Sequence, residues 1–173
     1  MSQENFSDDL QYSQVAHSNY TLHKHGSLPI SISIMVVRVS LVELGNLNNL
    51  LELHLSSNKL IGTIPSNIRK LKKLVLLDLE YNMLIGPIPF SLGYLTSLTY
   101  LSLGSNLINA LSGSIPSSLG GLINLGVLNI HSNKIDGTIN SKIRYCILLE
   151  QLDLSNNNLY GIIPFELTLL THL

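Results

Sequence analysis

The sequence is poor in aromatic, cysteine and charged residues, which argues against an aromatic core, a disulfide framework and a partner bound mainly through charge. Tryptophan is absent and aromatic residues make up only 6% of the 173 residues, so any core must be aliphatic. The single cysteine, Cys146, excludes an internal disulfide and therefore a disulfide framework. With 12% charged residues and a net charge of -1, the sequence gives no electrostatic reason to expect nucleic acid or an anionic membrane as partner. A hydrophobic content of 45% nevertheless predicts a folded chain.

Long hydrophobic runs are also missing. The longest apolar stretch, residues 28–39, contains Pro29 and Arg38 and falls short of the roughly 20 apolar residues of a membrane helix. The first residues lack the positive start and early apolar run of a secretory signal. The sequence therefore predicts neither a membrane span nor an export signal in this chain.

A repeat dominates the chain from Leu50 onwards. Similar phrases open 24 residues apart, with one interval of 27 residues. The openers are Leu50, Leu74, Leu98, Leu125, Leu149 and Leu173. Each opener begins the pattern LxxLxL, which is followed by columns of Asn, Gly and Ile-Pro. The Asn column comprises Asn58, Asn82, Asn133 and Asn157. The proline column is complete except in the fourth repeat, which has Asn140 there.

The columns have distinct structural roles. Alternation in LxxLxL predicts short parallel strands with one buried side, near residues 52–56, 76–80, 100–104, 127–131 and 151–155. An Asn side chain at the turn can pair backbone groups that would otherwise lack partners, so the Asn column predicts a structural ladder. After the proline, apolar residues recur about one helical turn apart, which predicts short helical or 3-10 turns. Cys146 shares a column with Leu71 and Leu95 and should be buried and unreactive.

The third repeat is three residues longer than the others. Its phrase NLINALSG offers two candidates for the Asn column, Asn106 and Asn109, and the pattern does not distinguish them. We expect a local bulge between Asn106 and Leu111.

The pattern LxxLxLxxNxLxGxIP with a 24-residue period resembles the plant-specific class of leucine-rich repeat. The resemblance implies an α/β repeat fold, a right-handed solenoid with a parallel inner sheet and short helical or 3-10 turns outside. Family members are ectodomains of receptor-like kinases and receptor-like proteins, and secreted inhibitors of cell-wall-degrading enzymes. The implied function is recognition of a peptide or protein, including a co-receptor ectodomain, on the concave face.

The resemblance also implies a location on the extracellular side of the plasma membrane. It implies no enzyme activity for this chain, because any kinase would lie in another domain. No cofactor, metal ion, nucleic acid partner or membrane insertion is expected for this chain either. Two alternatives stay open, a soluble inhibitor of a cell-wall hydrolase and an intracellular protein scaffold.

The sequence divides into three parts. Residues 1–27 form a polar head that is expected to be disordered. Residues 28–49 form a degenerate repeat or improvised cap, in which 28–34 alternates like a strand that could pair with the sheet edge. Five repeats and the first residue of a sixth follow, at 50–73, 74–97, 98–124, 125–148, 149–172 and 173. Because the flanking cysteine pairs of the family are missing, the array is expected to be a piece of a longer one.

Candidate binding residues are the positions of the strands and following turns that should face solvent, because these vary from repeat to repeat. They are Glu52, His54, Leu76, Asp78, Glu80, Tyr81, Tyr100, Ser102, Asn129, His131, Gln151 and Asp153. Leu76, Tyr81 and Tyr100 are the strongest candidates, since exposed aromatic and aliphatic groups supply contact area at interfaces. A metal site at His54 and His131 is not expected, because strands about 4.8 Å apart separate the two histidines too widely.

Overall fold

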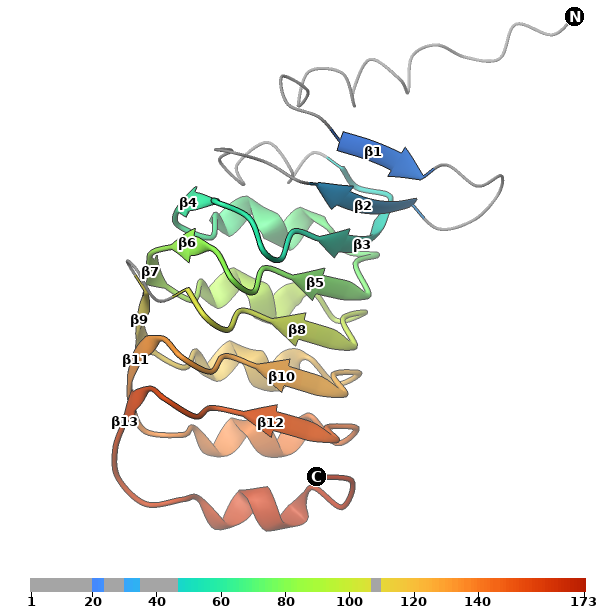
Figure 1. Ribbon diagram of the computed structural model, residues 1–173. Helices are drawn as coiled ribbons and strands as arrows, with labels where there is room; N and C mark the ends of the chain where they lie inside the picture. The colour runs from blue at the N-terminus through green and yellow to red at the C-terminus, as the bar shows by residue number, and fades with distance from the viewer. Residues whose placement is uncertain (1–19, 24–29, 35–46, 107–109) are drawn as a thin grey trace, which may run out of the picture.

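The computed structural model describes residues 20–23, 30–34, 47–106 and 110–173, and side chains in the last two ranges. The repeats stack in one direction as a solenoid, with a sheet on one side and a column of 3-10 turns on the other (Figure 1). The predicted architecture is therefore confirmed.

The main sheet has seven strands in the order β1-β2-β3-β5-β8-β10-β12. Five of them come from the repeats: β3 (Leu50–His54), β5 (Leu76–Asp78), β8 (Tyr100–Ser102), β10 (Val127–Asn129) and β12 (Gln151–Asp153). These five are parallel and pair one whole repeat apart, for example Leu77 with Leu101. Each strand ends two residues before its predicted end. Beyond the strand ends, isolated backbone hydrogen bonds still join neighbouring repeats, for example from Ser57 N–H to Glu80 O at 2.9 Å.

The N-terminal strands extend this sheet. Strand β2 (Ile30–Ile34) pairs in parallel with β3, the strand of the first repeat, which agrees over residues 30–34 with the strand and the pairing predicted at 28–34. Strand β1 (Tyr20–His23) pairs with β2 in antiparallel fashion. For residues 20–23 the expectation of disorder was therefore wrong, because an alternating tetrapeptide in the polar head finds a partner in β2. The rest of the polar head lies outside the described residues.

Short strands also line the edge of the solenoid between the sheet and the 3-10 turns. One ribbon contains β4 (Ile61–Gly62) and β6 (Met83–Leu84). The other contains β7 (Gly86–Pro87), β9 (Leu111–Ser114), β11 (Lys134–Gly137) and β13 (Asn158–Leu159). Glycine in this segment takes a positive φ in every repeat, 85° at Gly62 and 84° at Gly161, which explains the glycine column.

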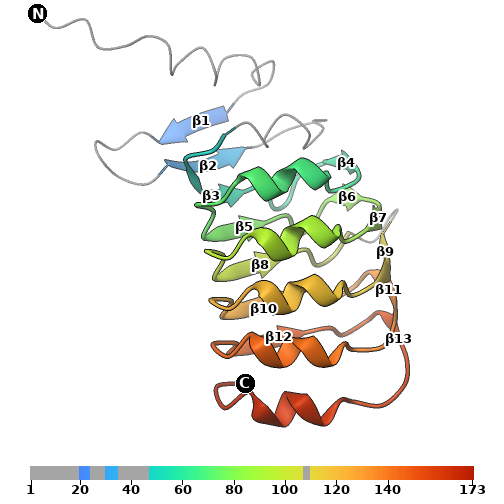
Figure 2. The ribbon, with the colours of Figure 1, turned by 180° about the vertical axis from the view of Figure 1, so that it is seen from behind.

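The outer face carries one 3-10 turn per repeat, as predicted (Figure 2). The turns are η2 (Ser66–Lys70), η3 (Phe90–Tyr94), η4 (Ser117–Gly121), η5 (Ser141–Tyr145) and η6 (Phe165–Leu169). Each begins after an extended residue, which is proline in four repeats. In the fourth repeat Asn140 adopts the same conformation, and its side chain accepts a hydrogen bond from Lys142 N–H at 2.9 Å. The capping bond explains why the proline can be replaced there.

The core is a continuous stack of leucine and isoleucine between the sheet and the turns. Leu77, Leu79, Leu101 and Leu103 have no exposed surface. Cys146 is also fully buried, and its Sγ lies 3.3 Å from Leu119 O. Burial raises the pKa of its thiol to about 11, so the prediction of a buried, unreactive cysteine agrees with the structure.

The asparagine column forms the predicted ladder. Asn82 shows the pattern: its Nδ2 donates to Leu55 O at 2.8 Å and to Leu79 O at 3.0 Å, while its Oδ1 accepts from Leu60 N–H. Equivalent side-chain bonds are made at Asn58, Asn106, Asn133 and Asn157. In the third repeat Asn106 therefore occupies the ladder, which settles the choice that the sequence left open.

The three extra residues of that repeat follow Asn106. Residues 107–109 lie outside the described residues, but both flanks are regular. Asn106 keeps its ladder bonds, and Leu111 N–H donates to Asn133 Oδ1 at 3.1 Å, as the equivalent leucines do. As predicted, the strand before the insertion and the segment after it are intact.

Candidate partner-binding face

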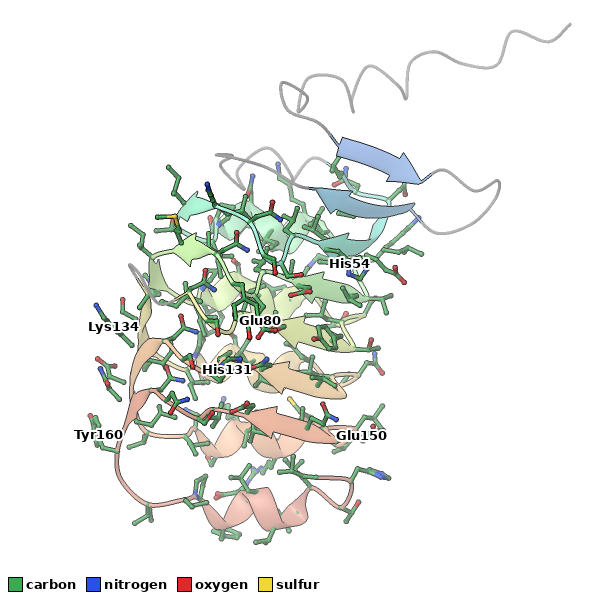
Figure 3. The ribbon with its side chains drawn as sticks, viewed as in Figure 1. His54, Glu80, His131, Lys134, Glu150 and Tyr160 are labelled. Carbon is green, nitrogen blue, oxygen red and sulfur yellow. The ribbon has the colours of Figure 1, made fainter. Side chains whose placement is uncertain are left out.

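The outward side of β3, β5, β8, β10 and β12, with the turns that follow them, is here called the sheet face (Figure 3). Its in-register pairing places the candidate residues in files that run across the strands. Leu76 pairs with Tyr100, and Asn129 pairs with Asp153. The candidate residues stand in register across the repeats, by strand pairing and by the backbone bonds that continue it; they are Glu52, His54, Leu76, Asp78, Glu80, Tyr81, Tyr100, Ser102, Asn129, His131, Gln151 and Asp153.

A contact between Glu80 and His131 spans three repeats at the centre of the sheet face. His131 Nε2 lies 2.9 Å from Glu80 Oε1, although Glu80 belongs to the second repeat and His131 to the fourth. Two strand spacings separate them, roughly 10 Å, which two long side chains can bridge. Gly104, in the same file of the repeat between them, leaves the space: a Cβ there would lie 2.7 Å from His131 Cδ2. Figure 3 shows the two side chains together.

The neighbouring polar groups hold this pair in place. Ser102 Oγ donates to Glu80 Oε2 at 2.9 Å, and Asn129 Nδ2 lies 3.5 Å from the same oxygen. On the other ring nitrogen, His131 Nδ1 lies 2.9 Å from Ser132 Oγ. Both ring nitrogens and both carboxylate oxygens thus have partners. Five side chains constrain one another in this network, and a polar network whose groups all have partners is expected to be rigid and preorganised.

Ser102 corrects one expectation. Its alternation in β8 predicted a solvent-facing side chain, yet the residue has no exposed surface. Glu80, which reaches across the strands toward His131, accepts its hydrogen bond and covers it. Ser102 therefore orients Glu80 and is not itself available to a partner.

Apolar groups lie beside the polar centre. Leu76 and Tyr100 are half-buried neighbours in one file, and Val127 continues it. Burial raises the pKa of the Tyr100 phenol, and the negative charge of Asp78 raises it further. Tyr81 stands at the end of its strand, 57% exposed, with a φ of 53°. The residue before the ladder asparagine has a positive φ in all five repeats, so the repeat itself imposes this conformation on an exposed aromatic side chain.

The remaining carboxylates lie on either side of the centre. Asp78 accepts a hydrogen bond from Glu80 N–H at 3.1 Å. Asp153 accepts from Ser155 Oγ at 2.6 Å and from Ser155 N–H at 3.0 Å, which lower the pKa of its carboxyl group. At the other end, His54 Nε2 lies 3.4 Å from Glu52 Oε2.

The sequence pattern placed these residues on one face but missed their pairing. The available signal was a file that reads Ser56, Glu80, Gly104, His131, Ser155, in which an acid and a histidine flank a glycine. Within the described residues, no group of three His, Cys, Asp or Glu side chains could hold a metal ion. Nor does that part of the chain contain a helix long and apolar enough to cross a membrane.

Comparison with known proteins identifies the repeat. The Leucine Rich Repeat family model matches residues 49–71, 73–95, 97–122 and 148–170, which together make up more than half of the chain. The unmatched interval contains the fourth repeat, with Asn140 in place of proline. The comparison with curated proteins gives no match.

Several solved structures with this fold are plant receptor ectodomains; a plant ice-binding protein has it too, at 30% identity and a TM-score of 0.69, covering 80% of this chain and 46% of that one. The ectodomain of the Arabidopsis receptor kinase HAESA, in complex with an IDA peptide hormone, is 31% identical with a TM-score of 0.78, covering 88% of this chain and 26% of that one. The plant peptide hormone receptor RGFR1, in complex with RGF2, is 34% identical with a TM-score of 0.73, covering 80% of this chain and 22% of that one.

A chain of the BIR3–SERK2 complex from Arabidopsis thaliana is also similar. It is 34% identical with a TM-score of 0.66, and the match covers 82% of this chain and 76% of that one. By contrast, this chain spans only 22 to 26% of the larger receptors. The shared fold is a recognition fold and not a catalytic one. The chain belongs to the leucine-rich-repeat family and resembles the plant receptor ectodomains within it.

Proposed function

We propose that this chain binds a peptide or protein ligand on its sheet face, the concave face of the solenoid, and that it works on the extracellular side of the plasma membrane as part of a receptor. The observation that carries the proposal is the preorganised centre formed by Glu80 and His131, with the half-buried Leu76 and Tyr100 beside it. Constrained polar groups provide specificity and apolar neighbours provide contact area, the combination typical of protein interfaces.

The similar structures support the class of ligand. HAESA and RGFR1 were solved in complex with a peptide hormone and with RGF2, respectively. The BIR3–SERK2 match adds a second kind of partner, a co-receptor ectodomain. Hydrolase inhibition and intracellular scaffolding stay as the alternatives from sequence, and no contact among the described residues favours them.

The test is selection of binders from a random peptide library displayed on phage, with the whole 173-residue chain as the target. Enriched peptides are synthesised and their affinities measured by fluorescence polarisation. We expect Tyr100→Ala to weaken binding at least tenfold, since truncation of a central aromatic anchor commonly costs more than about 1 kcal/mol. The matched control is Tyr145→Ala, which removes a tyrosine that is 47% exposed on the opposite, 3-10 side.

Circular dichroism melting of each variant separates lost binding from lost folding. Peptides whose affinity falls with Tyr145→Ala and not with Tyr100→Ala would place recognition on the outer face and contradict the proposal.

A further inference from the structure

Charge is strongly segregated between the two sides of the solenoid. The sheet-face segments, residues 52–57, 76–81, 100–105, 127–132 and 151–156, contain four carboxylates and neither lysine nor arginine. The carboxylates are Glu52, Asp78, Glu80 and Asp153. The 3-10 turns and the residues that follow them carry six cations and one carboxylate, Glu166; the cations are Arg69, Lys70, Lys72, Lys73, Lys142 and Arg144. A net charge of -1 for the chain therefore conceals an acidic face and a basic one.

The four carboxylates are not equivalent. Glu52 and Glu80 each have a histidine as partner, His54 and His131. Asp78 and Asp153 instead accept hydrogen bonds from the backbone N–H two residues further on. The Glu80 side chain is only 17% exposed, and both of its oxygens already have partners in Ser102 and His131. Asp78 and Asp153 are therefore the carboxylates beside the centre of the sheet face that keep one oxygen for a ligand.

The repeat fixes the distance between these two aspartates. Asp78, Ser102, Asn129 and Asp153 stand in register on four successive strands. Three strand spacings amount to roughly 14 Å. An extended chain rises about 3.3 Å per residue, so it covers this distance in about four residues. Between the aspartates it would pass over Asn129 and the buried Ser102, with Leu76, Tyr100 and Val127 along one side.

We propose that the ligand of the sheet face is an extended basic peptide that crosses the strands, with two lysine or arginine side chains four positions apart on Asp78 and Asp153. This inference rests on the proposed function and adds the charge and spacing of the ligand. Charge complementarity selects such a partner, because the sheet-face segments contain four carboxylates and neither lysine nor arginine. An aliphatic or aromatic residue of the peptide contacts Tyr100.

The probe is a fluorescein-labelled peptide with Lys at positions 1 and 5 and Leu at position 3 of a neutral Ser/Gly background. Comparison peptides carry Lys at positions 1 and 2, or Glu at positions 1 and 5. We expect the Lys-1,5 peptide to bind at least fivefold more tightly than the Lys-1,2 peptide, and the Glu peptide not to bind. The affinity should fall as NaCl rises from 50 to 300 mM, because the contacts are between exposed charges.

Variants of the chain locate the contact. The double variant Asp78→Asn, Asp153→Asn should bind the Lys-1,5 peptide at least tenfold more weakly than the parent chain does. Asp136→Asn is the matched control, since it removes an exposed carboxylate in β11 at the edge of the solenoid, and it should change the affinity less than twofold.

Equal affinity for both lysine spacings would overturn the proposed register. An equal loss with Asp136→Asn would reduce the interaction to general attraction between charges and overturn the site. If neutral peptides bind in place of the basic one, and Tyr100→Ala weakens their binding, the proposal that the ligand is basic is overturned while the proposed function of the sheet face stands. Binding of the basic peptide that neither Tyr100→Ala nor the double variant changes would contradict both.

Discussion

The second and fifth repeats have the same sequence pattern, but equivalent residues are more exposed to solvent in the fifth. Asn82 and Asn157 make the same bonds, three from Nδ2 to carbonyl groups and one from a backbone N–H to Oδ1. Asn82 is only 5% exposed, whereas Asn157 is half-exposed. The apolar columns differ more: Ile88 is 3% exposed and Ile163 is 77% exposed.

The direction of the contacts explains the difference. Asn82 reaches back to Leu55 O and Leu60 N of the preceding repeat, and Asn157 reaches back to Ile130 O and Ile135 N. The ladder therefore needs the repeat before it. Burial of the apolar columns also needs a repeat after it, as the one-dimensional stacking of repeat proteins implies. The same substitution should consequently cost more in the second repeat than in the fifth.

The largest difference is expected for the core leucines. Leu79→Ala removes a side chain with no exposed surface and leaves a cavity, which should cost about 3 kcal/mol. Leu154→Ala acts in the same column at a half-exposed position and should cost less than about half as much. Urea denaturation followed by circular dichroism gives both values. Equal losses would show that the fifth repeat is as well packed as the second.

The fourth residue of the 3-10 turns gives the next contrast. Gly93 lies in η3, where a Cβ would overlap the backbone carbonyl of Ser118 in the next repeat. Gly93→Ala must push the two turns apart and should cost about 2 kcal/mol. Thr168 occupies this column in η6 and already has a Cβ, so Thr168→Ala should stay within about 0.5 kcal/mol of the parent. A neutral Gly93→Ala in the same urea titration would show that adjacent turns can separate freely.

The asparagine ladder should show a smaller contrast. Asn82→Ala leaves buried backbone groups without partners and should cost about 2 kcal/mol. In Asn157→Ala, water can reach part of the same groups, so about 1 kcal/mol is expected, and the neighbour Asn156→Ala should be close to neutral. Thermal melts of the three variants rank them, and a larger shift for Asn156→Ala than for Asn157→Ala would refute the ladder assignment.

The thiol of Cys146 reports on the fifth repeat without perturbing stability. Its raised pKa means that the folded state holds the proton more tightly than the unfolded chain, so the thiol contribution to stability is lost as pH rises above about 8.5. At pH 7.5 alkylation by iodoacetamide, followed by mass spectrometry, should be slow in the native chain. Leu154→Ala should accelerate it more than Leu79→Ala, because opening of the last repeat uncovers the column that contains Cys146. The reverse order would mean that the repeats do not open from this end.

Most of the fold could be predicted from sequence because its cause is periodic. A leucine at a fixed offset has the same neighbours in every repeat, so the columns alone placed the strands, the turns, the ladder and Cys146. The choice between Asn106 and Asn109 could not be made in this way, because both satisfy the pattern; the ladder bonds of Asn106, including Leu84 N–H to its Oδ1, decide it.

The sheet face was predictable in outline only. The alternation placed its residues in files across the strands, although Ser102 proved buried, and contacts there depend on side-chain length and not on the period. Glu80 reaches His131 because Gly104 leaves room, and the same reach buries Ser102. The only signal of this contact in the columns is the glycine that stands between an acid and a histidine in one file.

The most direct test of the account is an NMR titration of the uniformly ¹⁵N-labelled chain with the Lys-1,5 peptide, with amide shifts recorded at each step. We predict that the largest shifts occur at Asp78, Tyr100, Asn129 and Asp153 on the sheet face, and that amides of η2 to η6 stay unchanged. Shifts concentrated in the 3-10 turns, with the strands silent, would contradict recognition through the sheet face.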